Sequence, residues 1–405
     1  MNYMSQNKNQ LTTTTGTGVA LRNASKSLKI TNKLLAEVDD FEKHWEWWLN
    51  LSKSWRVFYI KEVLKVDLSE EELFDKSLMY GHISKILDLT EIVIYPREWG
   101  YHPSQNPFIE NLDNPFLSQV PTNEKQIRFI DELIKSKPLS YLTKIEKLSF
   151  GRVRIPTLEI FNKILTLKDL YIDTEYTIDL TPIKNLRNLE VLTVNNNHIK
   201  DIRFLESLNK LKEVSFNVTR GFDFFSLENN YLTDINPLRN LINLQSLKIV
   251  TASNDLNPIS ELLNLKKLNL TLLKESSLTS LSDLHNLNEL SIALNDNSQF
   301  DLNFLNSLNN IKYLKINYRK LNIQTLPSLK KLTILDLSKQ KLNNITTIEK
   351  FDNLEELDLS NNAIYDIIPL ARIKSLKKII IYQNPILQKD IDWLRQQLPN
   401  CIIHF

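Results

Sequence analysis

The chain has 405 residues, of which 42% are hydrophobic, and its 50 Lys and Arg residues nearly balance its 48 Asp and Glu residues. This composition excludes collagen-like and disordered chains, and the balanced charge supplies no global field to attract nucleic acid or an anionic membrane. Only six glycines are present, which disfavours enzymes that cradle phosphates in glycine-rich loops. A partner must therefore recognise local surface chemistry.

Residues 1–38 form a flexible polar leader followed by a predicted amphipathic helix. Leu21, Leu28 and Leu35 lie on the apolar face of that helix. The helix either caps the rest of the chain or docks on another protein, and both alternatives stay open. Membrane adsorption is a third alternative, disfavoured because no aromatic residue anchors the helix. The leader lacks the apolar core of a secretory signal, and no run of eighteen apolar residues predicts a membrane span.

Residues 39–140 are predicted to form a helical N-terminal cap with a first strand and a proline-rich loop. Aromatic residues at helical spacing indicate helices over 41–52 and 55–63, and Ser69 with Glu72 forms the capping-box signal of a third helix to about 87. The tryptophan cluster is interpreted as core rather than as a ligand cage. A strand over 89–94 and a loop over 96–121 follow, and we expect the helices to dock on the first coil.

A repeat of about 22 residues fills residues 141–384. Its anchor has the pattern apolar-x-x-apolar-x-apolar, and successive anchors begin 21 to 24 residues apart, apart from one spacing of 33. The anchors begin at Ile145, Leu167, Leu189, Leu211, Leu244, Leu265, Leu287, Ile311, Leu332, Leu354 and Leu376. This period predicts an α/β leucine-rich repeat solenoid, in which a curved parallel sheet faces a convex side of short turns and 3₁₀ segments.

The repeat resembles that of the bacterial internalin-type leucine-rich repeat proteins, most closely over 189–199 and 354–364. The resemblance covers residues from about 141 to 405 and implies the solenoid fold, but it is not specific as to function. It also implies a ladder in which an asparagine after each strand bonds the backbone of a neighbouring coil. That slot holds Asn197, Asn230, Asn295, Asn362 and Asn384. Other residues occupy it in the remaining coils, including Gln340, so we expect an irregular curve.

The 33-residue spacing contains an insertion around Gly221–Phe225. The insertion is either a binding loop on one face or an aromatic cover for a mismatch between coils, and the second interpretation is favoured. At the other end, residues 385–405 resemble the helix-plus-strand C-terminal cap of bacterial repeat proteins. Cys401, the single cysteine, is interpreted as a buried cap residue rather than a reactive thiol.

Catalytic signatures are absent from the sequence. No dinucleotide-binding or P-loop motif, HExxH or CxxC occurs, and the six histidines lie in distant segments. The sequence therefore predicts a protein that is not an enzyme, with no cofactor, no metal and no small-molecule substrate. The single cysteine and the polar leader favour a soluble, cytoplasmic protein.

The predicted binding surface is the concave face. It is formed by the residues that lie between the inward-pointing anchor residues of each strand. Tyrosines with charges of both signs are typical of protein interfaces rather than of polyanion sites. The candidate residues are Tyr171, Thr193, Lys248, Lys267, Tyr313, Lys315, Tyr318, Asp336, Asp358 and Tyr382. An open alternative is that Lys315 and the two aspartates only stabilise the sheet by cross-strand pairing.

The predicted function is a non-enzymatic protein-binding module that presents a concave leucine-rich repeat surface to a protein partner. An alternative with the same fold is a regulatory or sensor subunit of a bacterial multi-protein effector system, in which the helix over 21–38 docks on an enzyme. Nucleic-acid binding is the third and least favoured hypothesis.

Overall fold

The computed structural model describes residues 40–94, 139, 141–151, 158–174, 179–196, 199–217, 231–295 and 299–405. They divide into two compact units, one up to Leu89 with 137–142 and one of the remaining residues from Thr90 onward. Several predictions lie outside the described residues. These are the helix with Leu21, Leu28 and Leu35, the loop over 96–121, the insertion at 221–225, and the ladder positions Asn197 and Asn230.

The first unit is helical, as predicted. A helix covers 40–50, and α2 (Lys53–Val57) continues directly into the π-helix η1 (Phe58–Val63). The predicted third helix starts later than expected. Ser69 and Glu72 do exchange the two hydrogen bonds of a capping box, but these close the turn that leads into the short 3₁₀ helix η2 (Glu72–Phe74). Helix α3 (Lys76–Leu87) begins instead after Asp75, whose carboxylate accepts two backbone N–H groups.

The aromatic cluster is the core of this unit, which confirms that interpretation. Trp48, Trp55 and Tyr59 are fully buried, and Trp48 Nε1 donates to the Leu73 carbonyl at 2.8 Å. Each ring buries a large apolar area, and the indole N–H finds the partner that burial demands. The tryptophans therefore fix the helices to one another and leave no open cage.

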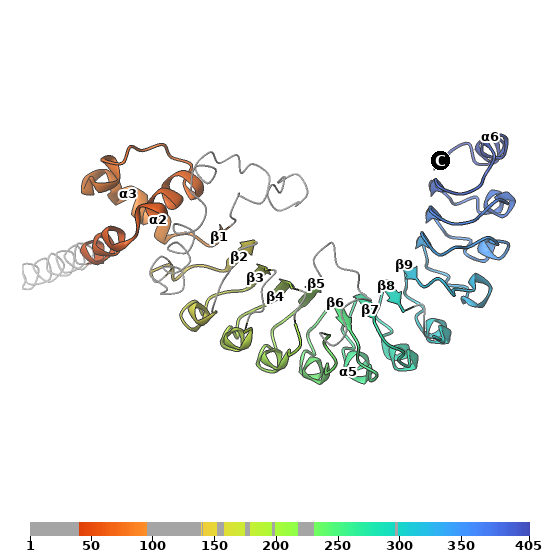
Figure 1. Cartoon of the computed structure of the whole chain (residues 1–405), viewed down its shortest axis with the longest axis horizontal. Coiled ribbons are helices and arrows are strands. Elements are labelled where there is room, and N and C mark those ends of the chain that lie inside the picture. The colour runs from red at the N-terminus through yellow and green to blue at the C-terminus, as the bar shows by residue number, and fades with distance from the viewer. Residues whose placement is uncertain are drawn as a thin grey trace, which may run out of the picture. The chain divides into compact units, whose positions relative to one another are not determined.

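The second unit is one parallel sheet of thirteen strands in chain order (Figure 1). The strands are β1 (Glu91–Ile94), β2 (Lys147–Gly151), β3 (Asp169–Asp173), β4 (Val191–Asn195), β5 (Glu213–Asn217), β6 (Ser246–Thr251), β7 (Lys267–Leu272), β8 (Glu289–Leu294), β9 (Tyr313–Asn317), β10 (Ile334–Asp336), β11 (Glu356–Asp358), β12 (Lys378–Ile380) and β13 (Ile402–His404). Within this unit the strands line the inner side of an arc, and the return segments form its outer side. The predicted solenoid is confirmed.

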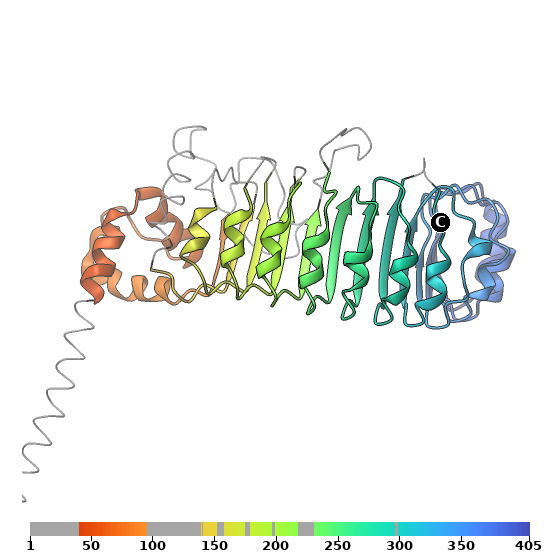
Figure 2. The same cartoon turned by 90° about the horizontal axis from the view of Figure 1, so that it is seen from below.

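The outer side consists mostly of short 3₁₀ helices, as the period predicts (Figure 2). They are η6 (Glu159–Asn162), η7 (Thr181–Asn185), η8 (Arg203–Ser207), η9 (Asn236–Asn240), η10 (Thr279–Asp283), η11 (Asn303–Ser307), η12 (Ile323–Thr325), η13 (Ile348–Lys350) and η14 (Ile368–Arg372), with one α-helical turn, α5 (Asn257–Ser260). An aspartate often precedes the helix and accepts the N–H two residues on, as Asp201 does from Arg203 and Asp366 from Ile368. This side-chain cap explains the repeated Asp in the return segments.

The coils are of two kinds. Strands β2–β9 have five or six residues, and in most of these coils the residue seven after the anchor faces the core. Strands β10–β12 have three residues, and there the equivalent residue has a left-handed φ of 56° to 62°, at Lys339, Asn361 and Gln383. That conformation ends the strand and turns the next side chain toward the neighbouring coil. The sequence did not predict this change of coil type, and the irregular curve expected from the missing asparagines stays a prediction.

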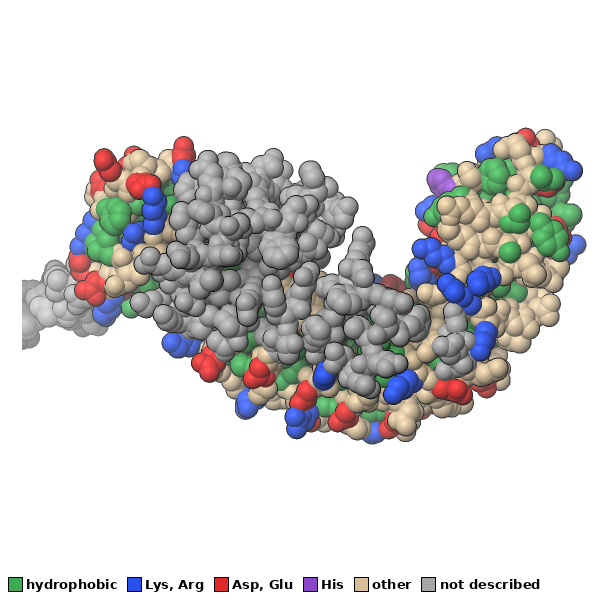
Figure 3. All heavy atoms as spheres, viewed as in Figure 1, with side chains coloured by type: hydrophobic (Ala, Val, Ile, Leu, Met, Phe, Trp, Pro, Cys, Tyr) green, Lys and Arg blue, Asp and Glu red, His purple; other side chains and the backbone are tan. Residues whose placement is uncertain are grey.

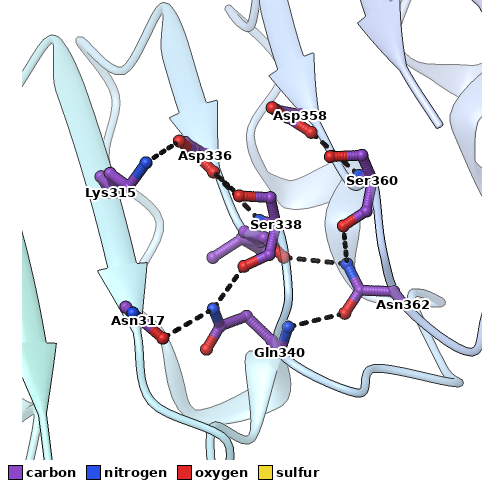
Figure 4. Close-up of polar contacts among 9 residues, drawn as sticks. Lys315, Asn317, Asp336, Ser338, Gln340, Asp358, Ser360 and Asn362 are labelled. Atoms are coloured by element: carbon purple, nitrogen blue, oxygen red, sulfur yellow. Dashed lines mark hydrogen bonds and ion pairs between the residues drawn. The ribbon is translucent and has the colours of Figure 1, made fainter. Parts of the chain in front are cut away.

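The asparagine ladder is present where the described residues allow it to be seen. Asn362 donates to the carbonyls of Leu337 and Leu359 and accepts from the N–H groups of Gln340 and Leu342. Asn384 and Asn295 make equivalent bonds to neighbouring coils. Gln340 also serves in the ladder, because its Oε1 accepts the Tyr318 N–H at 2.6 Å. Figure 4 shows its backbone N–H donating to Asn362 of the next coil. Gln340 therefore takes the role of the ladder asparagine that the sequence lacks at this position.

A second asparagine ladder runs along the start of the strands and was not predicted. The residue before the anchor donates its side-chain amide to a backbone carbonyl of the preceding coil. Asn188, Asn243, Asn264, Asn286, Asn310 and Asn353 make this bond. The signal was available, since these asparagines recur with the period of the repeat.

The chain ends with helix α6 (Gln388–Gln397) and strand β13, which extends the sheet beyond β12. The expected helix-plus-strand arrangement is therefore present. The interpretation of Cys401 as buried is wrong, because its side chain is only partly covered. That partial burial raises the pKa of the thiol, which disfavours the reactive thiolate.

Candidate protein-interaction surface

Strand register defines the rows of side chains on the inner side of the arc. Along each strand buried and partly exposed residues alternate, so the outward residues of neighbouring strands stand side by side. One row contains Ser149, Tyr171, Thr193, Ser215, Lys248, Asn269, Ser291, Lys315, Asp336, Asp358, Ile380 and His404. The structure thus brings six candidates, Tyr171, Thr193, Lys248, Lys315, Asp336 and Asp358, into one row.

The part of this surface nearest to β3–β5 is neutral and hydrogen-bonded. Asn195 Nδ2 donates to the Tyr171 hydroxyl at 2.8 Å, and Asn217 Nδ2 donates to Asn195 Oδ1 at 2.7 Å. Asn195 and Asn217 belong to the next outward row, which sequence reasoning did not select. This network holds the Tyr171 ring in place, so the residue offers a preorganised contact.

Lys248 lies further along the same row, on β6. Its side chain is exposed, yet partial desolvation by the surrounding protein lowers the pKa of the ammonium group. Within the described part of the chain the side chain of Lys248 makes no hydrogen bond or ion pair. Lys267, by contrast, is in the row beside it and is paired with Glu289 across β7 and β8 at 2.8 Å. The two predicted lysines therefore differ in the charge that they offer to a partner.

Lys315 and Asp336 form an ion pair across β9 and β10, with 2.6 Å between Nζ and Oδ2 (Figure 4). Burial opposes ionisation of Asp336, but the bonds from Lys315 and from the N–H and hydroxyl of Ser338 outweigh it, and the pKa of the carboxyl is lowered. Burial likewise opposes the charged form of Lys315, yet Asp336 raises its pKa. The predicted cross-strand pairing is thus present for Asp336.

Asp358 occupies the equivalent place on the next strand without an equivalent cation. It stands beside Asp336 in the register of β10 and β11, and its Oδ1 accepts the Ser360 N–H at 2.9 Å (Figure 4). No ion pair of Asp358 is found in the ranges that the structure describes. Cross-strand pairing that stabilises the sheet therefore accounts for Asp336 but not for Asp358.

Tyr313 precedes Lys315 by two residues and faces the same side of the sheet. Burial of Tyr313 raises the pKa of the phenol. The positive charge of Lys315 lowers this pKa, whereas the negative charges of Asp336, Glu289 and Asp358 raise it further. These couplings place the tyrosine and the charged residues within one electrostatic environment. Tyr382 lies beyond β12 with 44% of its surface exposed.

Tyr318 does not belong to the surface, and its prediction as a concave residue is wrong. The alternation of β9 continues past the strand, so Tyr318 faces the core, where only 5% of it is exposed. Its ring packs edge-on against Phe300 at 5.7 Å. The sequence prediction placed Tyr318 among the outward residues, whereas it lies just after β9 with its side chain turned inward.

Sequence reasoning missed the apolar members of the surface. Ile334, Ile380 and Ile402 occupy outward positions on β10, β12 and β13, and Ile402 is 62% exposed. For Ile334 and Ile380 the available signal was an isoleucine at an intervening position of the anchor, where most coils carry polar residues. We call the outward side chains of β9–β13, together with Tyr382 just after β12, the C-terminal concave surface. Its members are Tyr313, Lys315, Asn317, Ile334, Asp336, Glu356, Asp358, Lys378, Ile380, Tyr382, Ile402 and His404.

The described residues were also searched for a metal site and for a small-molecule pocket. No group of three or more His, Cys, Asp or Glu residues there could hold a metal ion. A polar groove of about 450 Å³ lies at the sheet edge where the long repeat spacing occurs. It is lined by Glu190, Lys210, Lys212, Asn243, Gln245, Asn264 and Lys266. Its lysines are occupied by neighbouring side chains, such as Glu190 for Lys212, so it has no activated group.

Charge elsewhere is dispersed. Figure 3 shows acidic and basic side chains interspersed along the outer side of the arc. No helix in the described part of the chain is both long and apolar enough to cross a bilayer. Sheet, register and return segments together define a leucine-rich repeat solenoid.

Comparison with solved structures supports this fold. The chain is similar to an internalin, InlF, from Listeria monocytogenes, with 24% identity, a TM-score of 0.51, and coverage of 66% of this chain and 76% of the internalin. A leucine-rich repeat protein of Leptospira interrogans matches at 19% identity and a TM-score of 0.37, over 66% of this chain and 86% of that one. Internalin C2 of Listeria monocytogenes matches at 21% identity and a TM-score of 0.33, over 55% of this chain and 82% of that one. No family model and no curated protein matches the sequence. The repeats are therefore internalin-type in fold.

Proposed function

We propose that the chain is a non-enzymatic protein-binding module and that its concave face receives a protein partner. The observation that carries this proposal is the pair of adjacent outward rows on the sheet, where tyrosines and partly buried charged residues stand in fixed register. Aromatic anchors on a preorganised surface lose little conformational entropy on binding. Leucine-rich repeat folds typically act as interaction modules, which agrees with this proposal.

A matched pair of tyrosine variants tests the proposal. Tyr382 is exposed on the concave side, and Tyr365 is exposed on the return segment before η14. Tyr382→Arg should reduce recovery of a specific protein from a cell lysate at least about tenfold, the scale of an interface hot spot. Tyr365→Arg should leave recovery unchanged. Equal recovery by both variants and the unmodified chain would contradict a concave binding face.

The regulatory alternative depends on residues 1–38, which lie outside the described residues, so it stays a prediction. The same holds for the cytoplasmic location, for which the single cysteine is the supporting feature.

A further inference from the structure

The charges of the C-terminal concave surface neutralise one another except at one place. Lys315 pairs with Asp336 at 2.6 Å, and Lys378 lies 3.5 Å from Glu356. Asp358 remains beside Asp336 in the sheet register, with Lys315 on the far side of that neighbour. Two carboxylates on adjacent strands repel each other, and a single lysine compensates only one of them. The surface therefore keeps one negative charge that the described residues do not balance.

The surroundings of Asp358 on its other side are apolar. Ile380 is its register neighbour on β12, and Tyr382 follows two residues later with an exposed ring. Ile402 extends the apolar area on β13, where it stands beside Lys378. A long cationic side chain could thus lay its methylene stem on the isoleucine and tyrosine while its charged end reaches the carboxylate. A short anion or a neutral polar group gains neither contact.

The size of the surface limits the form of the ligand. Five strands spaced about 4.8 Å apart give a track of about 19 Å across β9–β13. An extended chain advances about 3.3 Å per residue, so about six residues fill that track. The apolar side chains at both ends, Tyr313 and Ile402, favour aliphatic or aromatic residues on either side of the cation.

We infer that the C-terminal concave surface binds an extended peptide segment in which a Lys or Arg, flanked by aliphatic or aromatic residues, pairs with Asp358. This inference rests on the proposed concave binding face and specifies the chemistry of its partner. The pairing forms in a partly desolvated setting, which strengthens a charge-assisted hydrogen bond relative to one in open solvent.

A displayed library of random dodecapeptides, selected on the full-length chain, tests the inference. The enriched sequences should contain a Lys or Arg next to apolar residues. A synthetic peptide of the enriched sequence should bind Asp358→Asn at least tenfold more weakly than the unmodified chain. The asparagine keeps the acceptor for the Ser360 N–H, so the fold should be preserved, as an unchanged thermal transition would verify.

The matched control is Asp283→Asn, which makes the same chemical change on the convex helix η10 and should leave affinity unchanged. A charge exchange adds a gain of function: Asp358→Lys should bind the peptide whose cation is replaced by Glu. Selection of acidic peptides, absence of enrichment, or equal affinity for Asp358→Asn would overturn the inference. If one of these results were obtained but Tyr382→Arg still reduced recovery of a protein from lysate, the proposed concave binding face would be retained. Only the inference of a cationic peptide ligand would then be rejected.

Discussion

At the scale of single residues, environment separates side chains that the sequence makes look equivalent. Asp336 and Asp358 occupy the same position of successive repeats, yet only Asp336 has a lysine partner. Lys248 and Lys267 likewise share the concave face. The ammonium group of Lys267 is paired with Glu289, whereas that of Lys248 has no ion-pair partner among the described residues. The sequence shows which residues face outward, whereas pairing depends on which strands become neighbours in space.

The lowered pKa of Asp336 predicts a pH-dependent contribution to stability. A carboxyl whose folded pKa lies below its unfolded pKa stabilises the fold above the unfolded value, and the contribution is lost as pH falls through the folded pKa. Asp336→Asn should therefore lower the free energy of unfolding by about 1 kcal/mol at pH 7, because Lys315 is partly solvated.

Denaturant unfolding of both chains from pH 7 to pH 2 checks this prediction. The difference between them should shrink below about pH 4, where the unfolded aspartate takes up its proton. Comparing the two chains removes the effect of other carboxyls with lowered pKa values, such as Asp75 and Asp201. A difference that stays constant down to pH 2 would show that the ion pair is not formed.

At the scale of elements, the anchors predicted the strands because every inward position repeats with one period. Leu335 and Leu357 are buried as expected, and β10 and β11 pair through them. The length of each strand was harder to predict. It depends on whether the residue seven after the anchor turns left-handed, as Lys339 does, or points into the core, as Tyr318 does. A lysine and a tyrosine give no strong local signal for that choice, so stacking decides it.

The ladder asparagines should contribute unequally to stability. The side chain of Asn362 bonds five backbone groups between short-strand coils, whereas Asn353 donates to the exposed carbonyl of Lys330. Removal of Asn362 leaves buried donors and acceptors without partners, each at a cost of about 1–3 kcal/mol. Asn362→Ala should therefore destabilise the array by at least about 2 kcal/mol.

Chemical unfolding followed by circular dichroism measures that loss. Asn353→Ala is the control and should cost no more than about 1 kcal/mol. Similar midpoints for Asn362→Ala and the unmodified chain would mean that water replaces the asparagine and that the ladder does not hold these coils together.

At the scale of the whole molecule, a repeat array turns a short sequence pattern into a long surface. Each coil contributes two or three outward side chains, and the sheet register lines them up into rows. The rows make the concave face predictable from the sequence, as Lys315, Asp336 and Asp358 illustrate. The sequence prediction selected tyrosines and charged residues and so missed Ile334, Ile380 and Ile402. Apolar side chains of this kind are common in the core of protein interfaces.

Hydroxyl-radical footprinting of the chain with its captured partner is the most direct test of a concave binding face. Oxidation of Tyr382 should fall several-fold when the partner is bound, because the ring becomes covered, while oxidation of Tyr365 should not change. Both rings are exposed in the free chain, so each serves as the reference for the other. Protection of Tyr365 with Tyr382 still reactive would contradict the account and place the interface outside the concave face.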